Sequence, residues 1–401
     1  MNLQTRLWWV LAFALALDPG VFAQTEQTLY NFTGGTDGGT PLSSLVKDAA
    51  GNLYGTTFVG GVYGAGEVFE LSPNTSGGWT QSVLYSFTGG ADGANPYYAE
   101  VIFDKAGNLY GTTVEGGAQN LGVVFELTPT SSGWAESVLH SFAGGLDGNN
   151  PYSGLVFDPF GNLYGTTYAG GPYGIGTVFQ LRPASGGQWT EKVIHAFDTK
   201  TGSSPVGGLA LDGSGDLFGT TQGGGASGAG VVFELKYSGS DTWTAGVLHN
   251  FTGGADGGFP YAEKLILDKT GTLYGTTQGG GLNNSGVVFS LSPNGSGWKG
   301  RVLYSFNGAV EQNPFSGLAM DGGGNLYGTC ANGNGVTTVG SVFKLAPGAG
   351  GKYTESDLYL FTRGDGEFPE AALLIDKSGK LYGTTSSGGV DNMGVVFELS
   401  R

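Results

Sequence analysis

The stretch GNLYGTT at residues 161–167 decides the fold, because close copies of it recur along the chain at a nearly fixed period. Seven copies occur, spaced 53 to 56 residues apart, and they begin at Gly51, Gly107, Gly161, Gly215, Gly271, Gly324 and Gly379. A repeat of this length is expected to be one supersecondary unit that buries its apolar surface against neighbouring copies. The chain is therefore predicted to be a tandem array of seven units.

One unit, which starts at Pro151, contains four short runs rich in Val, Leu, Phe, Tyr and Thr that are separated by turn-forming residues. These runs predict β-strands near residues 155–158, 162–167, 177–181 and 189–197. The first two are joined by DPFG, and the other units have close variants in which Asp and Gly suit a hairpin turn. Asp158 and its counterparts are therefore predicted to be structural.

Several of these runs, such as GLVF and VVFEL, are apolar at successive positions, which indicates strands covered on both faces. A four-stranded antiparallel sheet that is repeated seven times and covered by its neighbours is a blade of a β-propeller. We therefore predict an all-β, seven-bladed β-propeller with four-stranded antiparallel blades. A linear β-solenoid is the alternative.

The two ends of the chain predict how the ring closes. TEQTLYNF at residues 25–32 matches the fourth strand of a unit, whereas the chain stops at MGVVFELSR, the third strand of the seventh unit. Pairing these segments would remove two exposed sheet edges. We expect the N-terminal strand to complete the last blade.

The first residues differ in character from the repeats. Arg6 precedes an apolar run from Leu7 to Leu17, and Ala23 stands before Gln24, which is typical of a secretory signal peptide. A buried helix is the alternative. We predict a signal peptide at residues 1–23, one propeller domain at 24–401, and no membrane span after processing. The mature protein is expected to be secreted, and to be extracellular, periplasmic or associated with the cell surface.

Charge and cysteine content exclude several classes. The chain of 401 residues has a formal net charge of −16, which disfavours nucleic acid and anionic membranes as partners. Cys330 is the single cysteine, so an internal disulfide is excluded, and no Cys/His spacing suits zinc. We expect a monomer with no metal and no cofactor.

The recurring GNLYGTT, followed by GVVFEL and LYSF or close variants, resembles the GloVer tandem-repeat family of secreted or surface-attached bacterial proteins. The resemblance covers residues 25–401. Some members carry C-terminal anchors, and the end at Arg401 without one leads us to expect release in soluble form. The resemblance implies no catalytic residue.

Three histidines share one repeat position in the fourth strand, where the other units have tyrosine; they are His140, His195 and His249. Because they lie in three different units, they cannot converge on one metal ion. We predict a structural role for them.

The candidate ligand site lies on the links that join the fourth strand of one unit to the first strand of the next. These links combine an Asp-Gly turn with proline and an aromatic residue, as in TGGADGANPYY. Carboxylates beside aromatic rings suit sugars, whose hydroxyls need acceptors and whose apolar faces stack on rings. The predicted contacts are Asp92, Tyr97, Asp147, Tyr152, Asp256 and Tyr261. Ordinary turn chemistry and calcium binding are the alternatives for the aspartates.

Two units have one extra residue between the link proline and the inner-turn aspartate. The extra residue predicts a bulge in the first strand, and bulges often re-aim side chains near functional sites. It places Glu100 and Glu263 near the axis, where other units have small residues, and we add both to the predicted ligand site. Charges that are merely solvated in a channel are the alternative.

Two classes of function fit these features. The first is a binding or scaffold module for glycans or a protein partner. The second is an extracellular enzyme, either a glycosidase or lyase that uses carboxylates near the axis or a quinoprotein dehydrogenase. The lack of a histidine cluster and of a sialidase-type Asp-box favours the binding module, and we assign no catalytic residue.

Overall fold

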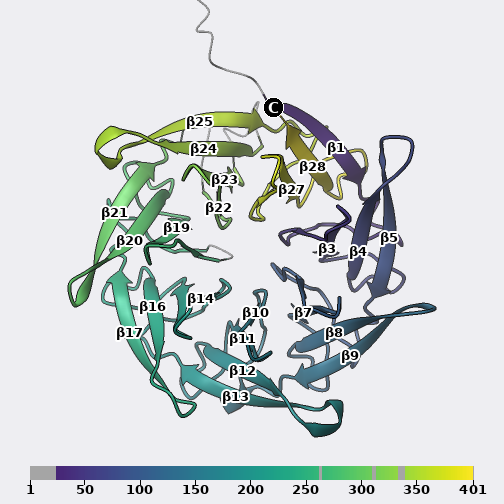
Figure 1. The fold of residues 1–401 in the computed structure, drawn as a ribbon, viewed down its shortest axis with the longest axis horizontal. Coiled ribbons are helices and arrows are strands. Elements are labelled where there is room, and N and C mark those ends of the chain that lie inside the picture. Colours follow the sequence, from purple (N-terminus) through teal and green to yellow (C-terminus); the bar gives the residue numbers. More distant parts are fainter. Residues whose placement is uncertain (1–23, 262–263, 309–312, 333–338, 401) are drawn as a thin grey trace, which may run out of the picture.

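The computed structural model describes residues 24–261, 264–308, 313–332 and 339–400. Its 28 strands form seven four-stranded sheets, arranged as blades around a central axis (Figure 1). All strand pairs within the blades are antiparallel, for example in the third blade. The predicted all-β, seven-bladed propeller is therefore confirmed, whereas the predicted signal peptide at residues 1–23 lies outside the described residues.

In blades 1 to 6 the chain runs outward from the axis, strand by strand, whereas in blade 7 the N-terminal strand is the outermost (Figure 1). Blades 1 and 2 comprise β2 (Val46–Lys47), β3 (Leu53–Thr57), β4 (Glu67–Pro73) and β5 (Trp79–Ser86), then β6 (Ile102–Phe103), β7 (Leu109–Thr113), β8 (Val123–Thr130) and β9 (Gly133–Ser141). Blades 3 and 4 comprise β10 (Val156–Phe157), β11 (Leu163–Thr167), β12 (Thr177–Pro183) and β13 (Trp189–Ala196), then β14 (Ala210–Leu211), β15 (Leu217–Thr221), β16 (Val231–Tyr237) and β17 (Trp243–Asn250).

Blades 5 and 6 comprise β18 (Ile266–Leu267), β19 (Leu273–Thr277), β20 (Val287–Asn294) and β21 (Gly297–Ser305), then β22 (Ala319–Met320), β23 (Leu326–Cys330), β24 (Ser341–Pro347) and β25 (Tyr353–Leu360). Blade 7 comprises β26 (Leu374–Ile375), β27 (Leu381–Thr385), β28 (Val395–Ser400) and β1 (Thr25–Asn31). The helices of the described residues are three short 3-10 turns, η1 (Gly145–Asp147), η2 (Ser185–Gly187) and η3 (Ala349–Gly351).

The outer strand of each blade contains a feature that the sequence did not predict. In blade 3, Val178 pairs with His195 and Phe179 pairs with Val193, so Ile194 is an extra residue. Such a bulge increases the local twist of a strand. It was missed because it falls inside a continuous apolar run with no turn residue to mark it.

A phenylalanine pair recurs at all seven blade interfaces. A Phe at the end of each outer strand meets the edge or face of a Phe in the third strand of the next blade, with ring centroids 5.0–5.2 Å apart. The pairs are Phe32–Phe69, Phe87–Phe125, Phe142–Phe179, Phe197–Phe233, Phe251–Phe289, Phe306–Phe343 and Phe361–Phe397. Every ring is at most 3% exposed, so these pairs form the core between blades.

The glycine in the middle of GNLYGTT makes room for this core. A Cβ atom on Gly165 would lie 2.5 Å from the ring of Phe179 and 2.9 Å from the side chain of Leu155. At the seven motif glycines together, the equivalent distance to the phenylalanine is 2.5–2.8 Å. Glycine is therefore required here by the close approach of a ring.

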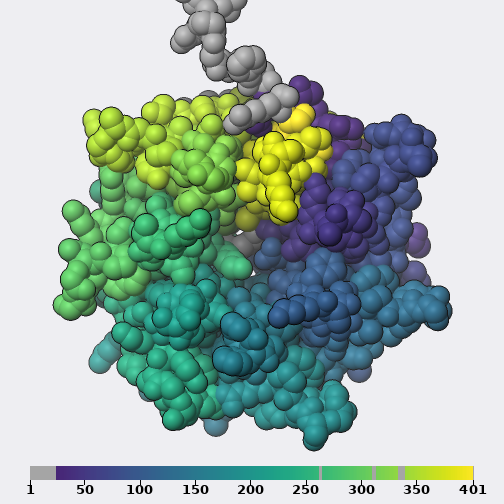
Figure 2. Space-filling view, viewed as in Figure 1, coloured from purple at the N-terminus to yellow at the C-terminus, as the bar shows by residue number. Residues whose placement is uncertain are grey.

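The N-terminal strand closes the ring as predicted. β1 pairs with β28 from Thr25 opposite Ser400 to Asn31 opposite Val395, and the purple and yellow ends lie side by side in Figures 1 and 2. Across the same junction, the Lys47 ammonium lies 3.0 Å from the Asp376 carboxylate. Burial would raise the pKa of Asp376, but hydrogen bonds from Ser378 and Lys47 together hold it well below its usual range.

Replacing Gly165 by Ala should destabilise the protein by about 1–3 kcal/mol, because the added methyl group overpacks the space beside Phe179. Thermal or urea unfolding measures the change. Gly246→Ala is the matched control, since Gly246 also lies in a strand but a Cβ there would meet no atom within 4 Å. Equal stability losses in the two variants would contradict this account of the motif.

Deleting residues 24–32 should lower the stability of the ring by several kcal/mol. The deletion removes the buried Phe32 and Leu29, and truncating one large apolar side chain already costs about 2–5 kcal/mol. It also exposes the edge of β28, so the variant should associate in size-exclusion chromatography. A monomeric variant that melts at the parent temperature would show that β1 is not needed to close the ring.

Candidate functional site

The inter-blade links and the loops between the second and third strands share one face of the ring. Isolated bridges join them directly, for example between Ala94 and Glu115 and between Asn149 and Ala169. We call this the link face. The opposite face, which carries the inner turns after the first strands and the turns before the outer strands, is called the turn face.

The link aspartates hold the links in place. The Tyr85 hydroxyl donates a hydrogen bond to Asp92 at 2.9 Å, and the amide of Thr88 donates to the same carboxylate at 2.8 Å. Burial would raise the pKa of Asp92, but its hydrogen bonds with Thr88 and Tyr85 lower it overall. Asp147 and Asp256 are bound in the same way by outer-strand histidines and link amides. No contact within the described ranges joins these three aspartates to the predicted tyrosines.

The histidines remain in separate blades, as predicted, and two of them bind the link aspartate that follows. The Nε2 atom of His140 lies 3.0 Å from Asp147, and that of His249 lies 3.2 Å from Asp256. Nε2 of His195 is buried and has no hydrogen-bond partner in the described part of the chain, and burial lowers the pKa of its ring.

One of these histidines belongs to a group that could hold a metal ion. Ligand atoms of His140, Asp147 and Glu191 lie within 4.8 Å of one another. The preceding interface places Tyr85, Asp92 and Glu136 at the same repeat positions. Because this arrangement recurs without the histidine, the group is explained as a structural contact between outer strands.

Aromatic residues from five blades meet around the axis on the link face. The Tyr97 ring contacts Phe58, Tyr98 and Tyr152, with centroids 4.5–5.4 Å apart. Tyr98 reaches across the axis to Tyr261 of blade 5, at 5.7 Å. The whole set, which we call the aromatic mouth, is Phe58, Tyr97, Tyr98, Tyr152, Tyr168, Tyr261 and Phe315. The structure thus brings the three predicted tyrosines together.

Polar groups face the same mouth. The Glu370 carboxyl of blade 7 lies near Tyr98 and Ser386, and burial raises its pKa. The phenol groups of Tyr98 and Tyr261 both lie near that of Tyr97. Burial raises the pKa of Tyr98 and Tyr261, so their phenols stay protonated and can donate hydrogen bonds at neutral pH.

Glu100 lies farther along the axis, inside the ring. Its backbone contacts Gly154 of the next blade, and burial raises the pKa of its carboxyl while the ammonium of Lys264 opposes the shift. Lys264 is exposed and lines a cavity of about 330 Å³ with inner-strand residues of blades 3 to 6. Glu263, the other predicted carboxylate, lies outside the described residues.

The extra residue of blade 2 is accommodated in a different way from the predicted bulge. The paired residues of β6 keep a regular register with β7, and the extra residue lies before them in a tight turn. In this turn Glu100 donates its amide to the Tyr98 carbonyl at 3.1 Å, and Tyr98 has a φ of 46°. The turn directs the Tyr98 ring across the axis, which sequence spacing alone could not reveal.

Two other residues of interest were also missed. Glu370 stands where other units have aliphatic or aromatic residues after the link proline, and that deviation was the available signal. Glu67 begins the third strand of blade 1, where other units have Val, Thr or Ser, and its side chain is 0% exposed. Gln81 donates to its Oε1 atom at 3.2 Å, whereas Oε2 has no partner in the described residues.

Glu67→Gln should stabilise the protein above about pH 7. Burial first, and the Asp37 charge second, raise the pKa of Glu67 from 4.5 to about 8. Ionisation of Glu67 therefore opposes folding progressively as the pH rises from about 4.5 to 8, and the opposition is complete above that range. The amide does not ionise, so the variant should gain about 2–4 kcal/mol over the parent at pH 8 and little at pH 4.

Urea unfolding of the parent and the Glu67→Gln variant across this pH range measures the difference. A difference in stability that does not change with pH would contradict a protonated, buried Glu67.

Within the described residues, no helix is long and apolar enough to cross a membrane.

Comparison with known proteins agrees with the expected family. The model of the Gloeobacter/Verrucomicrobia repeat matches three overlapping segments, residues 13–156, 74–265 and 211–401. The resemblance to the GloVer family is therefore confirmed over almost the whole chain. No protein of curated function matches the sequence.

Several solved structures share the propeller fold. PorZ, an essential surface component of the type-IX secretion system of Porphyromonas gingivalis, matches with a TM-score of 0.51 and 14% identity, over 88% of this chain and 46% of PorZ. A Thermus thermophilus protein described as a candidate oxidoreductase (glucose dehydrogenase) matches with a TM-score of 0.47 and 14% identity, over 94% of this chain and 100% of that one. A glucose dehydrogenase matches with a TM-score of 0.46 and 16% identity, over 94% and 99% of the two chains. Such identities indicate the fold alone.

Proposed function

The chain belongs to the Gloeobacter/Verrucomicrobia repeat family, and we propose that it is a secreted glycan-binding module whose ligand site is the aromatic mouth. One observation carries the proposal: rings and phenol groups from five blades converge there, next to the Glu370 carboxyl of a sixth. Secretion rests on the predicted signal peptide at residues 1–23.

The chemistry of the mouth suits sugars. Tyr97, Tyr152 and Tyr261 are half-buried, so part of each ring is open to a ligand, whereas Tyr98 is only 5% exposed and closes the centre. Apolar faces of sugar rings stack on such aromatic surfaces, and phenols and carboxyls bind the hydroxyl groups. The net charge of −16 favours a neutral glycan over an acidic one.

Each predicted site residue has a role in this proposal. Tyr97, Tyr152 and Tyr261 contact the glycan, and Glu100 binds hydroxyl groups that enter the channel. Glu263 is assigned the same role from its place beside Lys264 in the sequence. The link aspartates Asp92, Asp147 and Asp256 position the links that carry these tyrosines.

A carbohydrate-active enzyme is the second candidate. The observation in its favour is that Glu100 and Glu370 both have a pKa raised by burial, and a protonated carboxyl can act as a general acid. Product analysis after incubation with the bound glycan separates the two functions. Binding without turnover selects the module, and cleavage that Glu370→Gln or Glu100→Gln abolishes selects the enzyme.

The ligand site is tested by screening the secreted protein on a glycan array and measuring the best ligand by calorimetry. Tyr97→Ala and Tyr261→Ala should each weaken binding by about 1–2 kcal/mol, roughly 5- to 30-fold, because a stacked ring is lost. Tyr173→Ala is the matched control, since this tyrosine lies on the link face but is 67% exposed and outside the mouth.

Unchanged affinity in both mouth variants would place the glycan elsewhere. A loss of affinity that Tyr173→Ala shares would show a general effect on the link face and would also contradict the proposed site.

A further inference from the structure

A second cavity lies on the turn face, between blades 3 and 4. Its volume is about 410 Å³, and its walls include Phe160, Tyr164, Tyr237 and Trp243. Phe160 is 88% exposed and Tyr237 is 40% exposed, so both rings are open to a ligand. We call this cavity the 3/4 groove.

At the 3/4 groove, several residues differ from those that other units have at the same repeat positions. Phe160 stands in the inner turn where the other units have small or polar residues, namely Ala50, Ala106, Ser214, Thr270, Gly323 and Ser378. Tyr237 ends its strand where the first, second, third, fifth and sixth units have proline. Arg182 stands where other units have Ser, Thr, Ala or Lys. A residue type that every blade has at one position is explained by the fold. These three residues differ from the other blades, and they add two aromatic rings and a cation to one interface.

Two further departures, both in blade 4, leave a hydrogen-bond acceptor without its usual donors. In blade 3, Oδ2 of Asp158 accepts bonds from Asn162 at 2.6 Å and from the Tyr164 hydroxyl at 3.1 Å. In blade 4, Asp216 and Phe218 occupy the places of that Asn and Tyr, so both donors are missing.

Asp212, the counterpart of Asp158 in blade 4, is therefore incompletely bonded. Its Oδ1 atom accepts the amides of Ser214 and Asp216 at 2.8 Å, whereas Oδ2 has no partner in the described part of the chain. Asp212 is half-buried and lines both the 3/4 groove and the neighbouring cavity between blades 4 and 5, so this oxygen is an acceptor where the two cavities adjoin.

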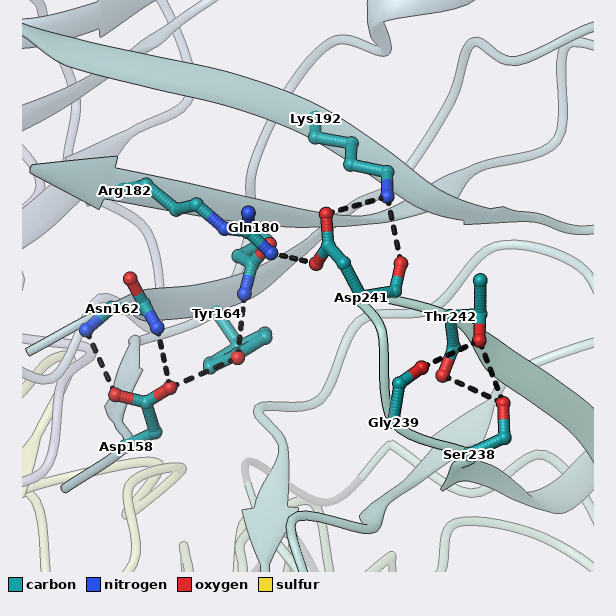
Figure 3. A network of polar contacts seen from close by, with 10 residues as sticks. All are labelled: Asp158, Asn162, Tyr164, Gln180, Arg182, Lys192, Ser238, Gly239, Asp241 and Thr242. Atoms are coloured by element: carbon teal, nitrogen blue, oxygen red, sulfur yellow. Dashed lines mark hydrogen bonds and ion pairs between the residues drawn. The ribbon is translucent and has the colours of Figure 1, made fainter. Parts of the chain in front are cut away.

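A chain of contacts fixes the guanidinium of Arg182 at the groove wall (Figure 3). Its Nε atom donates to Gln180 at 2.8 Å, and Gln180 in turn donates to the Tyr164 hydroxyl at 2.6 Å. On the other side Arg182 pairs with Asp241, which Lys192 also binds at 3.0 Å. These contacts leave the Nη1 group of Arg182 with no partner among the described residues, and the side chain is 41% exposed.

We propose that the 3/4 groove is a second glycan site, which binds one or two neutral sugar rings on the opposite face from the aromatic mouth. Phe160, Tyr237 and Trp243 supply ring surfaces, Asp212 supplies an acceptor, and Arg182 supplies donors. The charge favours a neutral ligand, because Asp158 and Asp212 outnumber Arg182 in the lining and Asp241 already pairs with Arg182. The volume lies within the range of small-molecule sites.

The next interface provides a natural control. A cavity of about 500 Å³ lies between blades 4 and 5, with Phe218, Trp298 and Pro293 in its wall. At this interface Ser214, Lys236 and Pro293 occupy the repeat positions of Phe160, Arg182 and Tyr237, and of these three only Pro293 lines the cavity. Because the open aromatic rings are missing, the same architecture should not bind a sugar there.

The proposal goes beyond the function proposed for the mouth, and calorimetry of the secreted protein tests both. The probes are cellotriose, xylotriose and chitotriose, which are neutral, and trigalacturonate, which is acidic. We expect two equivalents of a neutral trisaccharide to bind. Phe160→Ser and Asp212→Asn should each weaken one of the two sites at least tenfold, whereas Ala106→Ser, which puts serine at the matching turn of blade 2, should change neither.

The outcomes separate the two sites. Loss of one equivalent in Phe160→Ser, with the other lost in Tyr97→Ala, supports both proposals. A single equivalent that Phe160→Ser removes and Tyr97→Ala leaves supports the 3/4 groove and overturns the mouth. If a single equivalent binds and Phe160→Ser leaves it unchanged, the groove proposal is wrong. It is also wrong if only trigalacturonate binds, or if none of the four probes binds.

Discussion

The close approach of a phenylalanine ring to the glycine of GNLYGTT is the constraint on which the rest of the structure depends. In blade 3 the Phe179 ring occupies the space that a side chain at position 165 would need, and its other side meets Phe142 of the preceding blade. The motif glycine thus lets each third-strand phenylalanine ring pack against the second strand of its own blade and against a phenylalanine of the preceding blade. Repetition of this contact at seven interfaces closes the ring.

In a ring of similar units, ligand sites are expected where the residues of particular units differ from those at the same repeat positions elsewhere. The positions before the innermost strands face a shared axis, so single changes there combine with changes from distant units. Tyr98 of blade 2, Tyr261 of blade 5 and Glu370 of blade 7 are far apart in the sequence, yet they meet in one mouth. On the turn face, by contrast, the two grooves described above each lie between neighbouring blades. The 3/4 groove accordingly combines Phe160 and Arg182 of blade 3 with Asp212 and Tyr237 of blade 4.

The architecture could be predicted from the sequence, because the repeat period and the apolar pattern of the strands are visible in it. So is the incomplete last unit, whose missing strand matches the N-terminal segment. It also identified Tyr97, Tyr152 and Tyr261 as neighbours, since they share a repeat position near the axis. It could not show that Tyr98 turns across the axis, because that depends on a local φ of 46°, nor that the Asp92 carboxylate is already bound by Tyr85 and Thr88. The 3/4 groove was missed because its residues lie in two units and become a site only when the blades are side by side.

The central claim is that neutral glycans bind where repeat positions diverge, at the mouth and at the 3/4 groove. Hydrogen–deuterium exchange of the secreted protein, with and without its best neutral oligosaccharide, tests this claim most directly. Slower exchange should be confined to amides near Tyr97–Glu100, Tyr152 and Glu370 and to those near Phe160, Asp212 and Tyr237. Protection spread along the outer strands, or no protection at either place with the glycan bound, would contradict the account.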